Sequence, residues 1–469
     1  VRSWWGKNIN PEIFHEIINI YIKYMKNDKE INQIIRVIKE LFQKNKNNPN
    51  ELSKLIDTYL IPQELEKKSN AEVSTPYTLR NEMLDTITKY GNPDFWKTPK
   101  KVFEPCSGKG GFLIDILNRF MEGLKEYEPE QDKRYKLIVE ECIYFSDINP
   151  TNIFINKLLL DPDNKYKLNY NEGNTLELDI KDKWGLEGFD LVVGNPPYNA
   201  NNKRTTGVTL WQKFVSISIN KWLKTEHGFL VFIHPASWRK PVSKTCNYNR
   251  DMFKMMFHNN SMLYLSIHNT IDGMKTFKCG TRYDWYILKT EKIVTNKKCI
   301  VRTEKNKILE INPKDFEWLP NHNFEIIKKI TNNNEKIKIL YSRTSYGGDK
   351  KWMSKVKEKE YTYPCIHSTP IKGVRYMYSN TNKNGFFGIP KIILGDSNIN
   401  PVIDKEGLYG MTNHSFGIMI NDVNEIDNIY NVLKSDKFKD FIKSCSWSNY
   451  QIDWRLFTYL NKDFWKEFI

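Results

Sequence analysis

The sequence lacks the features of several protein classes. Its seven cysteines include no Cys-x-x-Cys pair, which argues against a structural zinc site, and their odd number fits a reducing compartment. No run approaches the roughly 18 apolar residues of a transmembrane helix, and no secretory signal peptide is visible. No convincing Pro-Asp…Glu-x-Lys nuclease pattern occurs. We therefore expect a cytoplasmic protein with neither a metal site nor a membrane partner.

Acidic residues are also in deficit. Lys plus Arg number 71 against 56 Asp plus Glu, a net charge of +15, which favours a polyanionic partner. The imbalance is strongest over residues 336–391, with 12 Lys/Arg, 3 Asp/Glu and nine interleaved aromatic residues. This pattern is typical of a nucleic-acid-reading lobe, although a strand-rich domain with a solvated basic face would give it too.

The length of 469 residues allows two or three domains. Apolar residues at helical spacing predict a helical N-terminal segment over residues 1–70. Strands alternating with helices predict an α/β domain over residues 71–295. The change in composition after residue 300 predicts a separate mixed α+β domain over residues 296–469.

An apolar run from Phe189 to Gly194 ends in Asn195-Pro196-Pro197-Tyr198. The run predicts a buried parallel strand, and the prolines end it because they cannot donate to a sheet ladder. Open α/β sheets bind ligands at the carboxyl ends of their strands. The Asn195 side-chain oxygen and the Pro196 carbonyl can each accept a hydrogen of an amino group, and Tyr198 can stack on a flat ring. An ordinary proline-rich turn is the alternative interpretation.

A glycine-rich turn joins a predicted strand to a predicted helix within residues 102–112. Gly108 and Gly110 allow a tight turn and the close approach of a ligand at the helix N-terminus, and Glu104 ends the strand. The dinucleotide fingerprint has a third glycine and an acid about 20 residues further on. This chain lacks that glycine, and its next strand-end acid, Asp147, follows Glu104 by 43 residues (147 − 104). NAD is therefore disfavoured.

Polar residues follow two further predicted strands. The Asp147 carboxylate can accept both hydroxyls of a ribose while Ile148 packs on a base, although Asp147 could instead cap the next helix. After the third strand, the Asn174 oxygen can accept from an amino group. Upstream, Thr75 and Pro76 suit the N-cap and first turn of a helix near residues 78–90.

In their order, these motifs resemble the gamma arrangement of adenine-N6 DNA methyltransferases, above all the methylase part of type IIG-like restriction–modification enzymes. The specific likeness covers residues 75–290. It implies a Rossmann-like, seven-stranded, mostly parallel α/β methyltransferase sheet, with the last domain as the target-recognition domain. It also implies S-adenosylmethionine as cofactor, held by Thr75, Pro76, Tyr77, Glu104, Pro105, Ser107, Gly108, Gly110, Asp147, Ile148, Asn174, Thr175, Asn195 and Pro197.

The resemblance further implies that Asn195, Pro196, Pro197 and Tyr198 are catalytic. Tyr198 and Phe277 would then stack on a flipped-out adenine, while Lys203 and Arg204 would hold DNA phosphates. This sequence has Asn174 where the family usually has Asp, which weakens that one assignment. A core position for Phe277 and a solvated loop for Lys203 and Arg204 remain open.

The expected partner is double-stranded DNA, and a separately encoded restriction endonuclease is compatible with the resemblance. The sequence does not fix the oligomeric state, and a monomer is compatible with it. Three alternatives share Asn-Pro-Pro-Tyr or the basic composition. They are a ribosomal RNA N6-adenine or N2-guanine methyltransferase, a release-factor glutamine methyltransferase, and a nucleic-acid-binding protein with a relict cofactor pocket.

Overall fold

The computed structural model describes residues 73–469 apart from 162–163, 200–208, 242–246, 293, 295–297, 333–334, 344–345, 398 and 448–451. The predicted helical segment 1–70 lies outside these residues. The chain divides into two compact units. The N-terminal unit comprises residues up to 235 with 254–302 and 306–313, and the C-terminal unit comprises 236–253, 303–305 and 314–469. Both units therefore take residues from each side of position 295. None of the described helices is long and apolar enough to cross a membrane.

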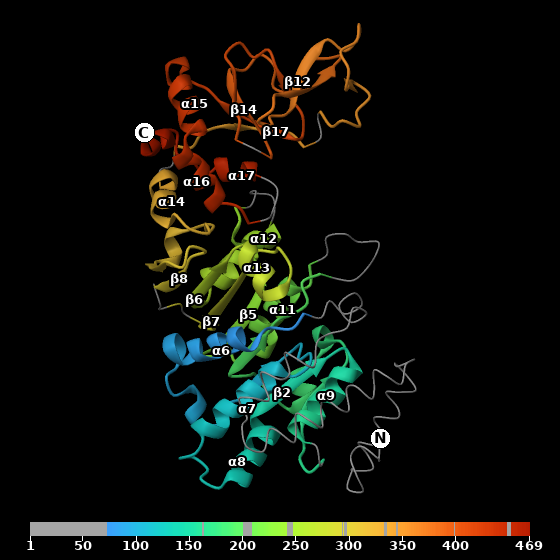
Figure 1. Cartoon of the computed structure of the whole chain (residues 1–469), viewed down its shortest axis with the longest axis vertical. Coiled ribbons are helices and arrows are strands. Elements are labelled where there is room, and N and C mark those ends of the chain that lie inside the picture. Colours follow the sequence, from blue (N-terminus) through green and yellow to red (C-terminus); the bar gives the residue numbers. More distant parts are fainter. Residues whose placement is uncertain are drawn as a thin grey trace. The chain divides into compact units, whose positions relative to one another are not determined.

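One nine-stranded sheet forms the centre of the N-terminal unit, in the order β3-β2-β1-β4-β5-β7-β6-β8-β9 (Figure 1). Strands β1 to β5 pair in parallel, whereas β7 is antiparallel to both β5 and β6. The predicted seven strands correspond to β1–β7, and β8 and β9 extend the edge beyond β6. The strands are β1 (Val102–Glu104), β2 (Ile143–Asp147), β3 (Asn169–Glu172), β4 (Leu191–Gly194), β5 (Phe229–Pro235), β6 (Ser261–His268), β7 (Tyr283–Lys289), β8 (Cys299–Arg302) and β9 (Ile308–Ile311).

Helices bury both faces of the parallel half of this sheet. The predicted apolar stripe of α7, which includes Leu113 and Phe120, joins the main core with residues of α6 and α9. On the other face, Phe103 stacks against Phe189 and meets the indole of Trp222 edge-on. Because β4 is covered on both faces, all four of its residues are buried, as its unbroken apolar run predicts. The helices are α6 (Tyr77–Thr86), α7 (Gly111–Gly123), α8 (Gln131–Leu137), α9 (Pro150–Leu160), α10 (Ile180–Trp184), α11 (Trp211–Ile217) and α13 (Thr270–Phe277), with α12 (Asn247–Phe257) contributing to both units.

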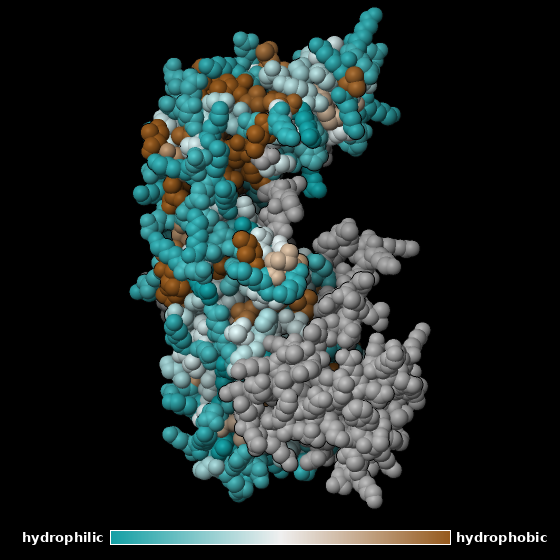
Figure 2. All heavy atoms as spheres, viewed as in Figure 1, coloured by the Kyte–Doolittle hydropathy of each residue, from teal (hydrophilic) through white to brown (hydrophobic). Residues whose placement is uncertain are grey.

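In its described residues, the C-terminal unit contains two four-stranded sheets, β10-β17-β14-β15 and β11-β13-β12-β16, together with four α-helices and part of α12. On the face shown in Figure 2, its hydrophobic residues form patches within a largely hydrophilic surface. The strands are β10 (Ile339–Leu340), β11 (Met353–Ser354), β12 (Tyr363–Ser368), β13 (Arg375–Ser379), β14 (Lys391–Gly395), β15 (Val402–Asp404), β16 (Gly410–Met411) and β17 (Ser415–Met419), and the helices are α14 (Phe324–Thr331), α15 (Ile426–Lys434), α16 (Asp436–Ser444) and α17 (Trp454–Phe457).

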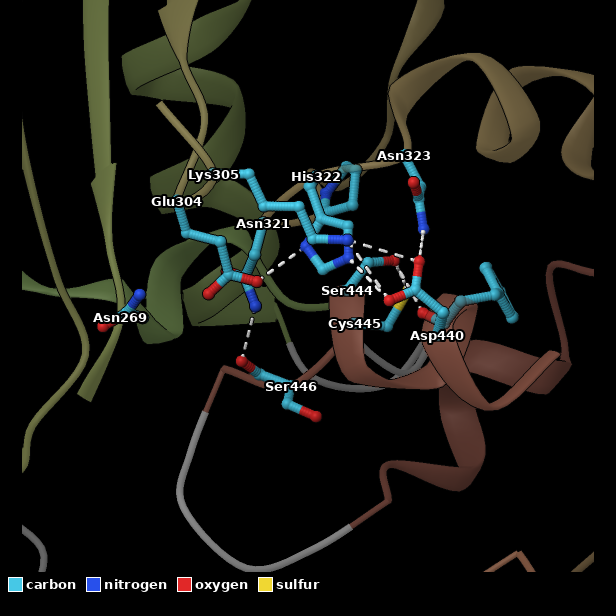
Figure 3. A network of polar contacts seen from close by, with 12 residues as sticks. Asn269, Glu304, Lys305, Asn321, His322, Asn323, Asp440, Ser444, Cys445 and Ser446 are labelled. Atoms are coloured by element: carbon cyan, nitrogen blue, oxygen red, sulfur yellow. Dashed lines mark hydrogen bonds and ion pairs between the residues drawn. The ribbon is translucent and has the colours of Figure 1, made fainter. Parts of the chain in front are cut away.

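A network of polar contacts joins distant segments of the C-terminal unit (Figure 3). The His322 ring lies between two carboxylates, with Nδ1 at 2.6 Å from Glu304 and Nε2 at 3.5 Å from Asp440. The Arg239 guanidinium, fully buried, donates to the Pro320 carbonyl and to Asn321 Oδ1. These contacts tie residues 303–305 and the segment before α14 to helix α16, and thereby hold together parts of the unit that are far apart in the sequence.

Candidate active site

The carboxyl ends of β1, β2 and β4 lie side by side, because these strands are parallel neighbours in the sheet. The predicted acids Glu104 and Asp147 are the last residues of β1 and β2, and Asn195 directly follows β4. A Cβ atom added to Gly194 would lie 3.7 Å from Cγ of Glu104. The structure thus brings together residues that are far apart in the sequence.

Asn195 presents a side-chain acceptor that has no partner in the described chain. Its Nδ2 group donates to the Val73 carbonyl at 3.3 Å, which orients the amide, while its Oδ1 atom is buried and accepts no hydrogen bond. Since a buried polar atom without a partner costs free energy, this oxygen is suited to an external donor. An amino group supplies such a donor.

Tyr198 is the last residue of the Asn-Pro-Pro-Tyr loop. Its hydroxyl is also buried without a hydrogen-bond partner in the described chain, and burial raises the pKa of this phenol, with a smaller contribution from Tyr283. The side chain therefore stays neutral. The backbone after Tyr198 is anchored, because its carbonyl accepts from Leu210 N at 3.0 Å and Asn199 pairs with Thr209. The predicted phosphate contacts Lys203 and Arg204 lie between these anchors, outside the described residues.

The glycine-rich turn after β1 is held to β2 by its backbone. Ser107 N donates to the Ser146 carbonyl at 3.0 Å, and Gly108 N donates to Asp147 Oδ2 at 2.8 Å. Gly110 has a φ of 84° and serves as N-cap of α7, and a Cβ there would lie 2.4 Å from Asn156 Oδ1. Both the backbone conformation and the lack of space therefore require glycine at position 110.

Asp147 does not cap helix α9. The cap is Asn149, whose side chain accepts from Thr151 N at 3.1 Å, whereas Asp147 Oδ1 accepts from Asn149 N at 2.8 Å. Asp147 thus orders the turns that follow both β1 and β2. Next to it, Ile148 is 60% exposed, and its packing on a flat ring stays a prediction.

Glu104 is a buried carboxyl group with an unpaired oxygen. It is 3% exposed, and Oε2 has no hydrogen-bond partner in the described chain. Burial raises the pKa of Glu104 well above its ordinary value, the nearby Asp147 raises it further, and Arg80 opposes both. A positively charged ligand at this position would relieve the cost of the unpaired oxygen.

Arg80 is an important residue that the sequence analysis does not identify. Its Nε donates to Asp115 Oδ2 at 2.6 Å, and both side chains are buried. It also donates to the Thr75 carbonyl, and a Cβ at Gly111 would lie 2.7 Å from its Cζ atom. Arg80 thereby joins the start of α6 to α7. No local pattern marks it, since an Arg within a helix is usually exposed.

The prediction that Thr75 caps helix α6 is wrong. The N-cap is Pro76, and no side-chain cap bond forms. Thr75 is instead buried, and its carbonyl is engaged by Arg80. The reason is that the helix starts at Tyr77, one residue after the position that would make Thr75 a cap. Thr75 and Tyr77 nevertheless lie close in sequence to Val73, whose carbonyl contacts Asn195.

The segment after β3 is tied to the glycine-rich turn. Thr175 Oγ1 donates to the Pro105 carbonyl at 2.8 Å. Asn174 uses its side chain locally, since Oδ1 accepts from Leu176 N and Nδ2 donates to Glu177. The oxygen retains one lone pair for a ligand.

Phe277 ends helix α13 and is partly buried. It packs against the core of the N-terminal unit and meets Tyr283 edge-on at 5.1 Å. Its role as a stacking residue therefore stays a prediction. His234 is fully buried, stacks on Trp211 and contacts the Tyr286 hydroxyl at 3.1 Å, so its surroundings give it a structural role.

A segment of the chain that includes part of this site matches a protein-family model. Residues 141–270 match the Eco57I restriction-modification methylase family. The matched segment includes Asp147, Asn174 and the whole Asn-Pro-Pro-Tyr loop. The predicted resemblance to restriction–modification methylases is therefore confirmed over this segment. No curated protein sequence matches the chain significantly.

Two solved restriction–modification enzymes share the fold of this chain. The type IIL restriction–modification enzyme MmeI, solved with DNA, is 9% identical with a TM-score of 0.51, and the match covers 87% of this chain and 70% of that protein. A nuclease-deletion mutant of the type ISP enzyme LlaGI is 11% identical with a TM-score of 0.51 over 93% and 50% of the two chains. A modification subunit assigned to a type I restriction enzyme from Vibrio vulnificus is 14% identical with a TM-score of 0.38 over 54% and 51%. This chain therefore spans about half the length of the last two proteins.

Proposed function

We propose that this chain is a site-specific DNA methyltransferase that transfers a methyl group from S-adenosylmethionine to N6 of an adenine flipped out of duplex DNA. The observation that carries the proposal is the buried, unpartnered Oδ1 atom of Asn195 at the end of β4. It lies within the segment that matches the restriction–modification methylases. A buried acceptor in this position fits a hydrogen-bond donor such as an amino group and does not fit a carbonyl group.

The residues around the glycine-rich turn fit the proposed cofactor. The unpaired Oε2 of Glu104 would accept a hydrogen bond from the cofactor's ammonium group. Gly108 and Gly110 would let the backbone approach its methionine part. Asp147 would accept the ribose hydroxyls, and the exposed face of Ile148 would pack on its adenine. When bound, the sulfonium compound supplies an electrophilic methyl group.

Asn195 would act by orienting and polarising the substrate amine. The lone pair of an exocyclic adenine nitrogen is delocalised into the ring, so the amine is a poor nucleophile. If Asn195 Oδ1 and the Pro196 carbonyl each accept one amino hydrogen, the nitrogen becomes more tetrahedral and its lone pair points away from the ring plane. In-line displacement then depends on holding the reacting atoms about 3–3.5 Å apart, and a short loop stiffened by two prolines suits that task.

The substrate base must leave the duplex to reach this loop, and flipping costs a few kcal/mol. Tyr198 would offset that cost by stacking on the base, at about 1–3 kcal/mol per base. Its neutral, partly buried ring suits this role, because burial keeps the pKa of the phenol high. Phe277 would contribute from the end of α13 if its ring turns toward the base.

The C-terminal unit is proposed as the target-recognition domain. The reaction site holds one base and cannot select a longer sequence, which requires side chains that reach base edges. The basic, aromatic-rich segment 336–391 belongs wholly to this unit. Three of its lysines have partners within the unit, however, and Lys350 lies 3.7 Å from Asp349. Lys391 pairs with Asp404 inside the unit, and Lys336 donates to the Thr331 carbonyl and Asn461.

Sequencing of host DNA tests the proposal. The chain and its Asn195→Ala variant are expressed in a host that lacks adenine methylation, and modified adenines are mapped. We expect N6-methyladenine within one short sequence for the original chain and none for the variant. If DNA stays unmodified while purified chain methylates ribosomal RNA with labelled cofactor, the RNA alternative is correct. If the chain fails to bind S-adenosylmethionine in calorimetry, the relict-pocket alternative is correct.

A further inference from the structure

The turn that joins β12 to β13 exposes a large apolar side chain. Ile371 is 86% exposed, the highest value among the large hydrophobic residues that the structure describes. A single exposed hydrophobic residue is common on protein surfaces. What sets this one apart is the construction of the turn beneath it and the charge of the surrounding chain.

The turn is held in one conformation by contacts at its base. Gly373 N donates to the Pro370 carbonyl at 3.1 Å, which closes a four-residue turn, and Gly373 has a φ of 135°. Asn400 Nδ2 donates to the same carbonyl at 3.1 Å. The preceding Thr369 is 2% exposed, and its hydroxyl accepts from Gly395 N at 2.9 Å. The tip is therefore fixed to the sheet that contains β14 and β15 as well as to its own two strands.

The hairpin from β12 to β13 contains no acidic residue, although Asp396, directly after β14, interacts electrostatically with His367 of β12. Between Tyr361 and Gly395 the sequence contains four Lys or Arg residues and no Asp or Glu. Lys391 is one of the four and is buried in a pair with Asp404. Lys372 and Arg375 are exposed beside the tip, and neither forms an ion pair with the part of the chain that the structure describes. An ordinary solvated hairpin has no need to exclude acidic residues, whereas a polyanionic partner does.

We propose that the β12–β13 hairpin is the element of the C-terminal unit that enters a groove of duplex DNA, with Ile371 against the bases and Lys372 and Arg375 against phosphates. This inference rests on the proposed function. The apolar groups that a duplex offers are the thymine methyl in the major groove and the faces of partly unstacked base steps. A rigid turn loses little conformational entropy on insertion. The contacts of Asn400 and Thr369 would therefore favour binding by holding the turn in one conformation before DNA arrives.

Two sets of variants with matched controls test the hairpin. Ile371→Ser removes the apolar tip, and Val423→Ser is its control, because Val423 is 53% exposed in the same unit but lies between Asp422 and Asn424. The double variant Lys372→Ala, Arg375→Ala removes two charges from the hairpin. Its control is Lys443→Ala with Lys462→Ala, which removes two exposed charges elsewhere in the unit. Melting curves of the full chain confirm that each variant is folded.

The first measurement is binding to a duplex of random sequence, about three helical turns long, at several salt concentrations. We expect the Lys372, Arg375 variant to lower the log–log salt slope by about 0.9 for each phosphate that it no longer neutralises. The Lys443, Lys462 control and Ile371→Ser should leave the slope unchanged. An unchanged slope in the hairpin variant, or tighter binding of the original chain to duplex RNA of the same sequence, overturns the inference. This measurement needs no catalysis, so it stays informative if the proposed function fails.

The second measurement maps methylated adenines in DNA of hosts that express each variant. Ile371→Ser should lower discrimination at one or two positions of the methylated sequence by about 5- to 100-fold, the range that one base contact supplies, and Val423→Ser should not. An unaltered methylated sequence in Ile371→Ser overturns the assignment of Ile371 to the bases. Absence of methylation by the original chain contradicts the proposed function instead, and the binding result then decides on the hairpin alone.

Discussion

A buried ion pair of the C-terminal unit contrasts with a buried carboxyl group of the N-terminal unit. In the C-terminal unit, Lys391 and Asp404 are 0% and 1% exposed in their side chains and 2.7 Å apart. Lys391 also donates to two carbonyls, and Asp404 accepts from the backbone of Leu408 and Tyr409. In the N-terminal unit, Glu104 is similarly buried, yet its Oε2 atom has no partner in the described chain.

The Lys391–Asp404 pair has a structural role, whereas the Glu104 carboxyl group is available to a ligand. The Lys391–Asp404 pair is satisfied by its own fold and fixes the loops on either side of β14 and β15. Glu104 and Asn195 each keep an oxygen without a partner in the described chain, at the ends of neighbouring strands, and leaving such atoms unpaired costs about 1–3 kcal/mol each. These two atoms lie at the ends of adjacent strands, where an external group can pair with each of them, which is why we place the chemistry there.

The largest expected effect on stability comes from breaking the satisfied pair. Lys391→Met leaves the Asp404 carboxylate buried and uncompensated, which typically costs about 3–5 kcal/mol of the free energy of unfolding. Urea unfolding should show this loss in the C-terminal unit. The double variant Lys391→Met, Asp404→Asn removes both charges and should recover part of it. A loss below about 1 kcal/mol in the single variant would show that the pair does not hold the loops beside β14 and β15 in place.

Asn195→Ala tests the opposite side of the comparison. Removing an unpaired acceptor should not reduce stability, but it should reduce methyl transfer by on the order of 100- to 1,000-fold, as the loss of one oriented polar group at a reaction centre does. S-adenosylmethionine binding, measured by calorimetry, should largely survive, because Asn195 is assigned mainly to the substrate amine. Near-normal turnover in this variant would contradict the mechanism.

Asp147 combines both functions, since it orders two turns and is assigned to the proposed ribose. Asp147→Ala removes acceptors for Gly108 N and Asn149 N and should weaken cofactor binding by about 1.5–3 kcal/mol, the range for hydrogen bonds to a charged group. Asp147→Asn keeps one neutral oxygen and should lose less. An unchanged dissociation constant in both variants would remove Asp147 from the cofactor site.

Sequence reasoning predicts the groups that sit at strand ends, because an apolar run followed by Gly or Pro marks both the strand and the place where it stops. Glu104, Asp147 and Asn195 are all found in this way. It cannot predict Arg80, whose burial against Asp115 and Gly111 depends on how α6 packs on α7. It also misses the strands β8 and β9, which lie beyond residue 295, the predicted end of the α/β domain. It also predicts that the helix begins at Pro76, with Thr75 as its cap, whereas the helix begins at Tyr77. The sequence does not distinguish a proline at the first helical position from a proline at the N-cap.

Phe277 is expected to have a smaller effect, which a pair of variants can assign. Stacking on a flipped base is worth about 1–3 kcal/mol, so Phe277→Ala and Phe277→Leu should both weaken binding to target DNA more than binding to unrelated DNA. If Phe277 only packs against Tyr283 and the core, Phe277→Leu should keep both target binding and melting temperature. Phe277→Ala alone would then lower the melting temperature.

The smallest effect is a pH dependence that arises from the unpaired carboxyl group itself. Burial raises the pKa of Glu104 well above its ordinary value, so a proton occupies the site at low pH and the carboxyl group cannot pair with the cofactor's ammonium group. As the pH rises toward this pKa, a larger fraction of the Glu104 carboxyl groups is ionised before the cofactor binds. The affinity for S-adenosylmethionine should therefore increase, by at most about tenfold per pH unit for one linked proton. Calorimetry between about pH 5 and 7 measures this while an α-amino group, with its pKa near 7.7–8.0, stays charged. Glu104→Gln should bind more weakly and lose the slope. If the affinity of Glu104→Gln for S-adenosylmethionine still rises with pH, the linked proton belongs to another group. Glu104 would then no longer contrast with the Lys391–Asp404 pair.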